Sequence, residues 1–215
     1  MSASAPASTT SASTHAPAAA SNSASVASGT LVSQIAATLG RAKGIRARFT
    51  QTQTRAALKQ PLVSSGSLLF VRERGAVWQI EKPYQATWVI SDSGVTELDA
   101  QGHRSAGGGT GAQGARGAAQ ISAMMRSMLG GDLSGLYSQF DVHAEGTLSH
   151  WQIELTPNQP QIAQAIQSLT LTGGDALRSL RIVTTRGEVS QFDFSDTTPV
   201  AELSPAERAL FETSR

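Results

Sequence analysis

Residues 66–80 read GSLLFVRERGAVWQI and contain two apolar runs joined by a short, charged, glycine-containing turn. The large apolar residues of each run have the same parity: Leu68 and Phe70 in the first, Trp78 and Ile80 in the second. A period of two is typical of β-strands, whose side chains alternate between the two faces of a sheet. The stretch therefore predicts an antiparallel hairpin with one strongly apolar face.

The same pattern continues on both sides of this hairpin. Downstream, Trp88 and Ile90 share a face, and turn signals stand at Lys82-Pro83 and at residues 91–94, SDSG. Upstream, residues 45–54 predict a strand in which Phe49 is the one large aromatic residue. Strands in series with short connections form an antiparallel meander, whereas a βαβ unit needs a long crossover.

A second set of strands is predicted after residue 140. The ranges are 140–144, 149–156, 168–172, 176–185 and 188–195, with a hairpin turn at 185–188. Alternation is cleanest in 149–156, where apolar and polar residues take turns. The inward-facing apolar residues of these strands are Trp151, Ile153, Leu169, Leu171, Phe192 and Phe194.

Helices are predicted before, between and after the strands, over 30–43, 118–129 and 159–167 and after Ser204. The sequence Ser204-Pro205-Ala206-Glu207 is a capping box with proline at the first helical position. We expect about nine to eleven strands in one curved sheet, because a large antiparallel sheet curls. The predicted fold is mainly β (α+β), an incomplete antiparallel β-barrel with helices as a lid and plug on its concave side.

The helix over 118–129 is strongly amphipathic. Its apolar positions follow the spacing i, i+3, i+4, i+7 and i+8, and they are Ile121, Met124, Met125, Met128 and Leu129. Methionine is adaptable and suits a surface that accepts ligands of varied shape. Two interpretations stay open: a lid over an apolar cavity, or ordinary core packing. Residues 102–117 are Gly-rich and predict a flexible loop or a plain insertion; no Gly-Lys-Ser/Thr follows, which excludes a phosphate-binding P-loop.

Composition excludes several classes of function. Seventeen Lys and Arg residues stand against 16 Asp and Glu, and this balance disfavours a nucleic-acid partner. The chain has no cysteine, which rules out disulfides and thiolate metal sites. No stretch approaches the ~20 apolar residues of a membrane span, so we expect a soluble protein.

Residues 1–29 are rich in Ala, Ser and Thr and carry no formal charge. Such a segment buries too little apolar surface to offset its ordering entropy, so we expect a disordered leader, followed by a single domain over 30–215. The leader lacks the features of a signal peptide. Three explanations remain: the export signal was removed or replaced, the true start lies elsewhere, or the protein stays inside the cell.

No catalytic constellation is visible, so we expect no enzymatic activity, no cofactor and no metal. The Gly-x-Ser-x-Gly motif of serine esterases is absent. His143 and His150 flank one predicted hairpin, but no carboxylate completes a metal site with them, and we interpret them as surface residues. An esterase, the enzymatic alternative, would turn over a chromogenic ester.

An ordered set of motifs resembles the LolA family of periplasmic outer-membrane lipoprotein carriers. In the first half these are Phe49-Thr50-Gln51, residues 66–72 (GSLLFVR), Trp78, Pro83 and residues 89–94 (VISDSG). In the second half they are residues 151–157 (WQIELTP) and Arg186-Gly187 with Phe192 and Phe194. The likeness covers residues 31–195.

The resemblance implies an unclosed β-barrel with a helical lid. It also implies a carrier that takes acylated lipoproteins from an inner-membrane ABC transporter to an outer-membrane receptor. We expect the protein to be a monomer. Arg72 matches by spacing the family's arginine that hydrogen-bonds to the lid, although Glu73 stands where the family has proline. A strand-end arginine in solvent is the alternative for Arg72.

As a hypothesis, the acyl chains of the cargo enter the concave cavity of this barrel. The lining residues would be Leu68, Phe70, Trp78, Ile80, Trp88, Ile90, Trp151, Ile153, Leu169, Leu171, Phe192 and Phe194. A LolA-like carrier of another acylated or polyene lipid, and an envelope sensor or scaffold on the same fold, are the alternatives.

Overall fold

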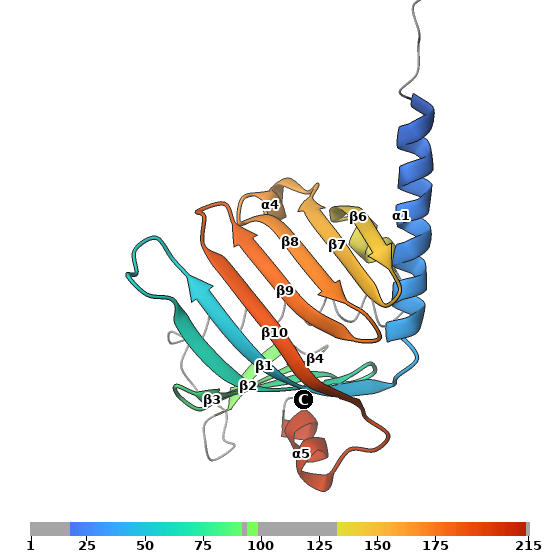
Figure 1. Cartoon of the computed structure of the whole chain (residues 1–215). Helices are drawn as coiled ribbons and strands as arrows, with labels where there is room; N and C mark the ends of the chain where they lie inside the picture. The colour runs from blue at the N-terminus through green and yellow to red at the C-terminus, as the bar shows by residue number, and fades with distance from the viewer. Residues whose placement is uncertain (1–17, 92–93, 99–132, 214–215) are drawn as a thin grey trace, which may run out of the picture.

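The computed structural model describes residues 18–91, 94–98 and 133–213 (Figure 1). The strands are β1 Gly44–Thr54, β2 Leu62–Val71, β3 Gly75–Lys82, β4 Ala86–Ser91, β5 Gly94–Leu98, β6 Phe140–Thr147, β7 His150–Pro157, β8 Ile166–Gly173, β9 Leu177–Thr184 and β10 Val189–Pro199. The helices are α1 Ala18–Leu39, α3 Ser134–Tyr137, α4 Pro160–Ala163 and α5 Pro205–Thr213.

All ten strands of the described chain form one antiparallel sheet in the order β5-β4-β3-β2-β1-β10-β9-β8-β7-β6. Each strand from β1 to β5 pairs with the next strand in the sequence, and so does each strand from β6 to β10. The first strand and the last then join the two meanders, with Phe49 opposite Phe194 and Gln51 opposite Phe192. The sheet curves without closing into a barrel (Figure 1), which confirms the predicted open antiparallel fold.

The inner face of the sheet carries the larger apolar core. Its register places Leu68 opposite Trp78, and Trp78 opposite Trp88, so three neighbouring strands present large apolar side chains in one row. The row continues through strands of the second meander into a single buried cluster that also includes residues of α1. Burial of this apolar surface is the main force that holds the curved sheet together.

Helix α5 lies on the opposite, outer face. There Phe211 packs in a smaller buried cluster with Leu69, Val77 and Val89, the strand residues of the other parity. The expectation that the helices lie on the concave side therefore fails for α5, because this part of the sheet is apolar on both faces. The predicted capping box is confirmed: the Glu207 amide donates to Ser204 Oγ (3.2 Å), and the Ser204 amide donates to Glu207 Oε2 (2.7 Å).

Helix α1 begins at Ala18, well before the start predicted at residue 30, and ends at Leu39. It therefore includes residues 18–29 of the segment that was expected to be a disordered leader. The expectation of disorder considered only how little apolar surface this segment can bury. It did not consider that alanine has the highest helix propensity of all residues. Tertiary contact adds to it: Ser28 is buried, and its Oγ accepts a hydrogen bond of 2.7 Å from the backbone N–H of Ala144 in β6.

Two other predicted elements differ from the structure or lie outside it. The helix expected over 159–167 is the single turn α4, because the chain returns to a strand at Ile166. The predicted helix 118–129 and the Gly-rich segment 102–117 lie outside the described residues. Within the described part of the chain, no helix has the length and apolarity that a membrane crossing requires.

Candidate functional site

The residues predicted to line a cavity come together on the inner face of the sheet. The buried members of that set are Leu68, Phe70, Trp78, Ile80, Trp88, Ile90, Trp151, Ile153, Leu169, Leu171 and Phe192. Phe194 is half-buried and packs against them. In this structure they pack against one another as a core, so a ligand among them requires that some of these contacts separate.

Three aromatic rings mark the centre of this core. The Trp78 ring lies 4.5 Å from that of Phe49, tilted by 38°, and 5.5 Å from that of Phe192 in an edge-to-face arrangement. Such geometries suit the ring quadrupoles and add to the energy of burial. Phe49 is 2% exposed but was not among the predicted cavity residues. As the one large aromatic residue of its strand, it carried the signal that could have placed it there.

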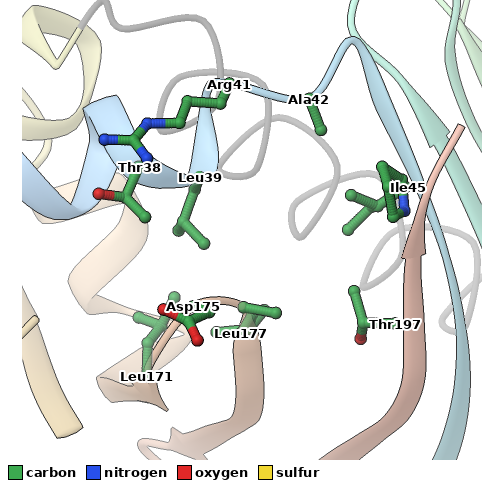
Figure 2. Close-up of a pocket in the computed structure, with 11 residues that line it drawn as sticks. Thr38, Leu39, Arg41, Ala42, Ile45, Leu171, Asp175, Leu177 and Thr197 are labelled. Atoms are coloured by element: carbon green, nitrogen blue, oxygen red, sulfur yellow. The ribbon is translucent and has the colours of Figure 1, made fainter. Parts of the chain in front are cut away.

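An open pocket of about 300 Å³ lies at one end of the inner face (Figure 2). Described residues that line it are Thr38, Leu39, Arg41, Ala42, Ile45, Leu171, Asp175, Ala176, Leu177, Thr197 and Pro199. Figure 2 shows the end of α1 with Thr38 and Leu39 on one side of the pocket, and Ile45 with Thr197 across it. Leu171 and Leu177 also belong to the buried inner cluster, so the pocket is continuous with the core.

Of the predicted cavity residues, Leu171 is the one that lines this pocket among the described residues. The remaining lining residues were not predicted from the sequence, and they come from the end of α1, the start of β1, the β8–β9 turn and the end of β10. These segments are far apart in the sequence, and their side chains show no shared pattern. Most of the pocket lining is apolar, and Arg41 and Asp175 are the charged residues among the described lining residues.

The turn after α1 forms one wall of the pocket, and Arg72 holds it. The Arg72 guanidinium donates from Nη2 to the carbonyl oxygen of Gly40, between the lining residues Leu39 and Arg41. The Arg72 backbone N–H donates to the carbonyl of Lys43 at 3.0 Å. One residue at the end of β2 therefore fixes both ends of this short turn.

The β8–β9 turn forms the opposite wall, and Trp151 holds it. The buried indole N–H of Trp151 donates to the carbonyl oxygen of Gly174 at 2.9 Å. A Cβ on Gly173 would lie only 2.3 Å from the Trp151 ring, so the ring packs here because residue 173 has no side chain. Asp175, Ala176 and Leu177, which follow in the chain, line the pocket.

The family model that describes outer membrane lipoprotein carrier proteins of the LolA-like type matches residues 20–205. This chain belongs to the LolA-like family. None of the curated proteins matches it significantly.

The solved structures that match this LolA-like protein share little sequence with it. A LolA superfamily protein of Nitrosomonas europaea is 10% identical, with 82% of this chain and 96% of that chain covered and a TM-score of 0.43. A putative outer membrane lipoprotein-sorting protein domain of Vibrio parahaemolyticus is 9% identical, with 86% and 97% covered and a TM-score of 0.45. The MucA/MucB complex of Pseudomonas aeruginosa gives 15% identity, 83% and 60% coverage and a TM-score of 0.45.

The resemblance predicts Arg72 as the lid arginine, and the structure places its guanidinium against the Gly40 carbonyl, just after the end of α1. Its side chain is half-buried, and Nε has no hydrogen-bond partner within the described part of the chain, like Nε1 of the buried Trp88. Glu73 and Arg74 beside it are exposed. The predicted lid residues Ile121, Met124, Met125, Met128 and Leu129 lie outside the described residues, so the latch between them and Arg72 stays a prediction.

The two histidines of the β6–β7 hairpin are both exposed. His143 lies opposite Glu154 in the register, and His150 opposite Thr147. Among the residues that the structure describes, no three His, Asp or Glu side chains gather in a way that could hold a metal ion.

Proposed function

We propose that this LolA-like protein is a periplasmic carrier that holds the acyl chains of a lipoprotein and moves it from the inner to the outer membrane. The chains enter at the pocket beneath the α1–β1 turn and extend along the apolar inner face. An ABC transporter supplies the cargo and an outer-membrane receptor accepts it. The protein binds its cargo without chemical change, so it is not an enzyme.

The observation that carries this proposal is the continuity between the open pocket and the buried inner cluster. Leu171 and Leu177 line the pocket and are also part of the core, so an acyl chain that enters there meets further apolar side chains. Each buried CH₂ contributes ~0.8 kcal/mol. The free energy gained by burying a chain of a dozen carbons therefore exceeds the lower estimates of the free-energy cost of association, which begin at about 4 kcal/mol.

The size of the pocket indicates how loading proceeds. A volume of about 300 Å³ is at the lower end of the range for small-molecule sites. Several acyl chains therefore need additional space, which opens only if residues of the inner cluster move apart. We place this movement at the turn after α1, because this turn forms a wall of the pocket and the Arg72 side chain holds it through a hydrogen bond to the Gly40 carbonyl.

Native mass spectrometry of the protein purified from its own cell envelope, with lipid extraction of what co-purifies, tests the proposal. We expect a bound acylated protein or lipid, and we expect uptake of a triacylated peptide by the emptied protein. Leu39→Asp and Ile45→Asp place a charge in the pocket at half-buried positions, so the fold should survive while uptake falls. Val63→Asp, at an exposed residue of the β1–β2 hairpin at the opposite end of the sheet, is the matched control.

Three results would redirect the proposal. A co-purifying lipid that is not attached to protein would identify a carrier of another acylated lipid. An empty protein that takes up no acyl compound, yet binds an envelope protein, would indicate a sensor or scaffold. Hydrolysis of an acyl ester, lost on substitution of a single Ser or His, would indicate an esterase.

A further inference from the structure

Exposed apolar side chains gather at the end of the sheet opposite the pocket. Seven large hydrophobic residues are exposed in the described part of the chain, and four of them stand in the β1–β2 hairpin and the neighbouring β3–β4 turn. Leu58, Leu62 and Val63 belong to the β1–β2 hairpin and are 41, 50 and 57% exposed. Tyr84, in the β3–β4 turn, is 58% exposed. Contiguous exposed apolar residues on a water-soluble domain mark a binding surface.

The end of the β1–β2 hairpin projects beyond the body of the sheet (Figure 1). Leu62 and Val63 are consecutive strand residues, so their side chains point to opposite faces, yet both are in solvent. Neither the inner cluster nor the outer cluster covers the hairpin at this point. The apolar residues are therefore free to enter another apolar phase without any rearrangement of the core.

Positive charge surrounds this hairpin. The β1–β2 and β9–β10 connections and the end of β3 carry Arg55, Lys59, Lys82 and Arg186, whereas the acidic residues of these same segments are Glu81 and Glu188. Both carboxylates form ion pairs with arginines: Glu188 with Arg55 at 3.9 Å, and Glu81 with Arg48 at 2.6 Å. Lys59, Lys82 and Arg186 remain as excess cations on three segments that the strand order makes neighbours.

We propose that this end of the sheet docks on the surface of a membrane that contains anionic lipids. Leu58, Leu62 and Val63 enter the boundary between headgroups and acyl chains, as the apolar parts of peripheral membrane proteins do. The lysines remain at the level of the phosphates, where their aliphatic stems cover apolar surface and their ammonium groups pair with the lipid charge. A protein partner would supply the same contacts only with a matching acidic and apolar groove, whereas a bilayer offers both phases to any projecting hairpin.

Vesicle flotation of the full chain tests this proposal, and it does not depend on whether the pocket is loaded. The probes are vesicles of phosphatidylethanolamine with phosphatidylglycerol, and vesicles of phosphatidylcholine alone. We expect binding to the anionic vesicles and much weaker binding to the neutral ones. Binding to the anionic vesicles should decrease as the salt concentration rises from about 50 to about 500 mM, because salt screens the surface charge. Lys59→Gln and Lys82→Gln should each lower the partition coefficient about fivefold.

Substitution of the apolar tip separates insertion from charge attraction. Leu58→Asp and Leu62→Asp should release the protein from anionic vesicles, whereas Leu148→Asp, equally exposed on the β6–β7 turn at the other end of the sheet, should bind like the wild type. Circular dichroism and thermal unfolding confirm that each variant is folded. Absence of wild-type binding at low salt, or an equal loss in Leu148→Asp, would overturn the proposal. So would binding by this hairpin to an envelope protein in the absence of lipid, if vesicles are not bound.

Discussion

The guanidinium of Arg46 in β1 and the carboxylate of Glu207 in α5 form a two-point ion pair. The Nε–Oε1 and Nη2–Oε2 distances are 2.7 and 2.8 Å. The same carboxylate accepts the Ser204 amide of the capping box. Glu207 therefore caps the helix and also attaches it to the sheet, which keeps Phe211 over the outer cluster.

We expect the Glu207→Gln variant to unfold more easily than the wild type at neutral pH. The Arg46 hydrogen bonds are the main cause that lowers the pKa of Glu207 from its ordinary 4.5 to about 2. The charged carboxylate thus stabilises the folded state above pH 4.5, and the contribution is lost as the pH falls towards 2. The pair is partly exposed, so the loss should be about 1 kcal/mol. Urea unfolding at pH 7 and at pH 2 measures it, and an equal difference at both values would contradict this account.

Two glycine substitutions should have opposite effects. Gly173→Ala places a Cβ against the Trp151 ring and the Ala176 carbonyl, at 2.3 and 2.5 Å, so we expect a loss of at least 1 kcal/mol, about the lower end for overpacking. Gly29→Ala in α1 meets no atom within 4 Å and should gain about 1 kcal/mol from helix propensity. Thermal unfolding of the two variants beside the wild type decides. If Gly173→Ala does not change the free energy of unfolding, the β8–β9 turn must be able to move and make room for the added methyl group.

Arg72→Leu should loosen the turn between α1 and β1. The substitution removes the donor to the Gly40 carbonyl but leaves the backbone hydrogen bond from residue 72 to Lys43 in place. We expect faster amide hydrogen exchange over residues 38–44, with little change in the rest of the sheet. Arg74→Leu, at an exposed position in the same β2–β3 turn, is the control. Unchanged exchange in Arg72→Leu would show that the turn is held by the backbone alone.

Phe49→Ala should cost more stability than Phe194→Ala, although the two residues lie opposite each other in the register. Phe49 is buried against Trp78, whereas Phe194 is only half-buried. Truncation of a buried phenylalanine typically costs about 3–5 kcal/mol. We expect a loss in that range for Phe49→Ala and a smaller one for Phe194→Ala, by denaturant unfolding followed through tryptophan fluorescence. Equal losses would indicate that the inner face is loosely packed.

The strands were predictable because one signal dominates them. The alternation of Leu68 and Phe70, of Trp78 and Ile80, and of Trp151 and Ile153 predicts both the strand and the buried face, and the structure buries all of these residues together. The capping box at Ser204 was readable for a similar reason, since it is a local arrangement of four residues. Period and local motif are properties of short windows, so a single sequence is sufficient for them.

The pocket and the position of α5 depend on contacts that no short window contains. Leu39, Leu171 and Pro199 meet only after the sheet has brought the two meanders together. The outer cluster was visible in principle, because Leu69, Val77 and Val89 give the other parity of the same strands an apolar character. Such strands predict two buried faces, and the final amphipathic helix is a suitable cover for the second.

The hydrogen bond between Ser28 and Ala144 has a consequence for how molecules of this protein meet one another. β6 is the last strand at its side of the sheet, and an unprotected last strand can recruit a strand from a second molecule and start a growing assembly. α1 runs along β6 (Figure 1). The Ala144 amide, which an incoming strand would need, already donates its hydrogen bond to the Ser28 hydroxyl. By covering this strand, α1 protects this side of the sheet against polymerisation, and Ser28→Ala would remove the acceptor with little change in side-chain volume.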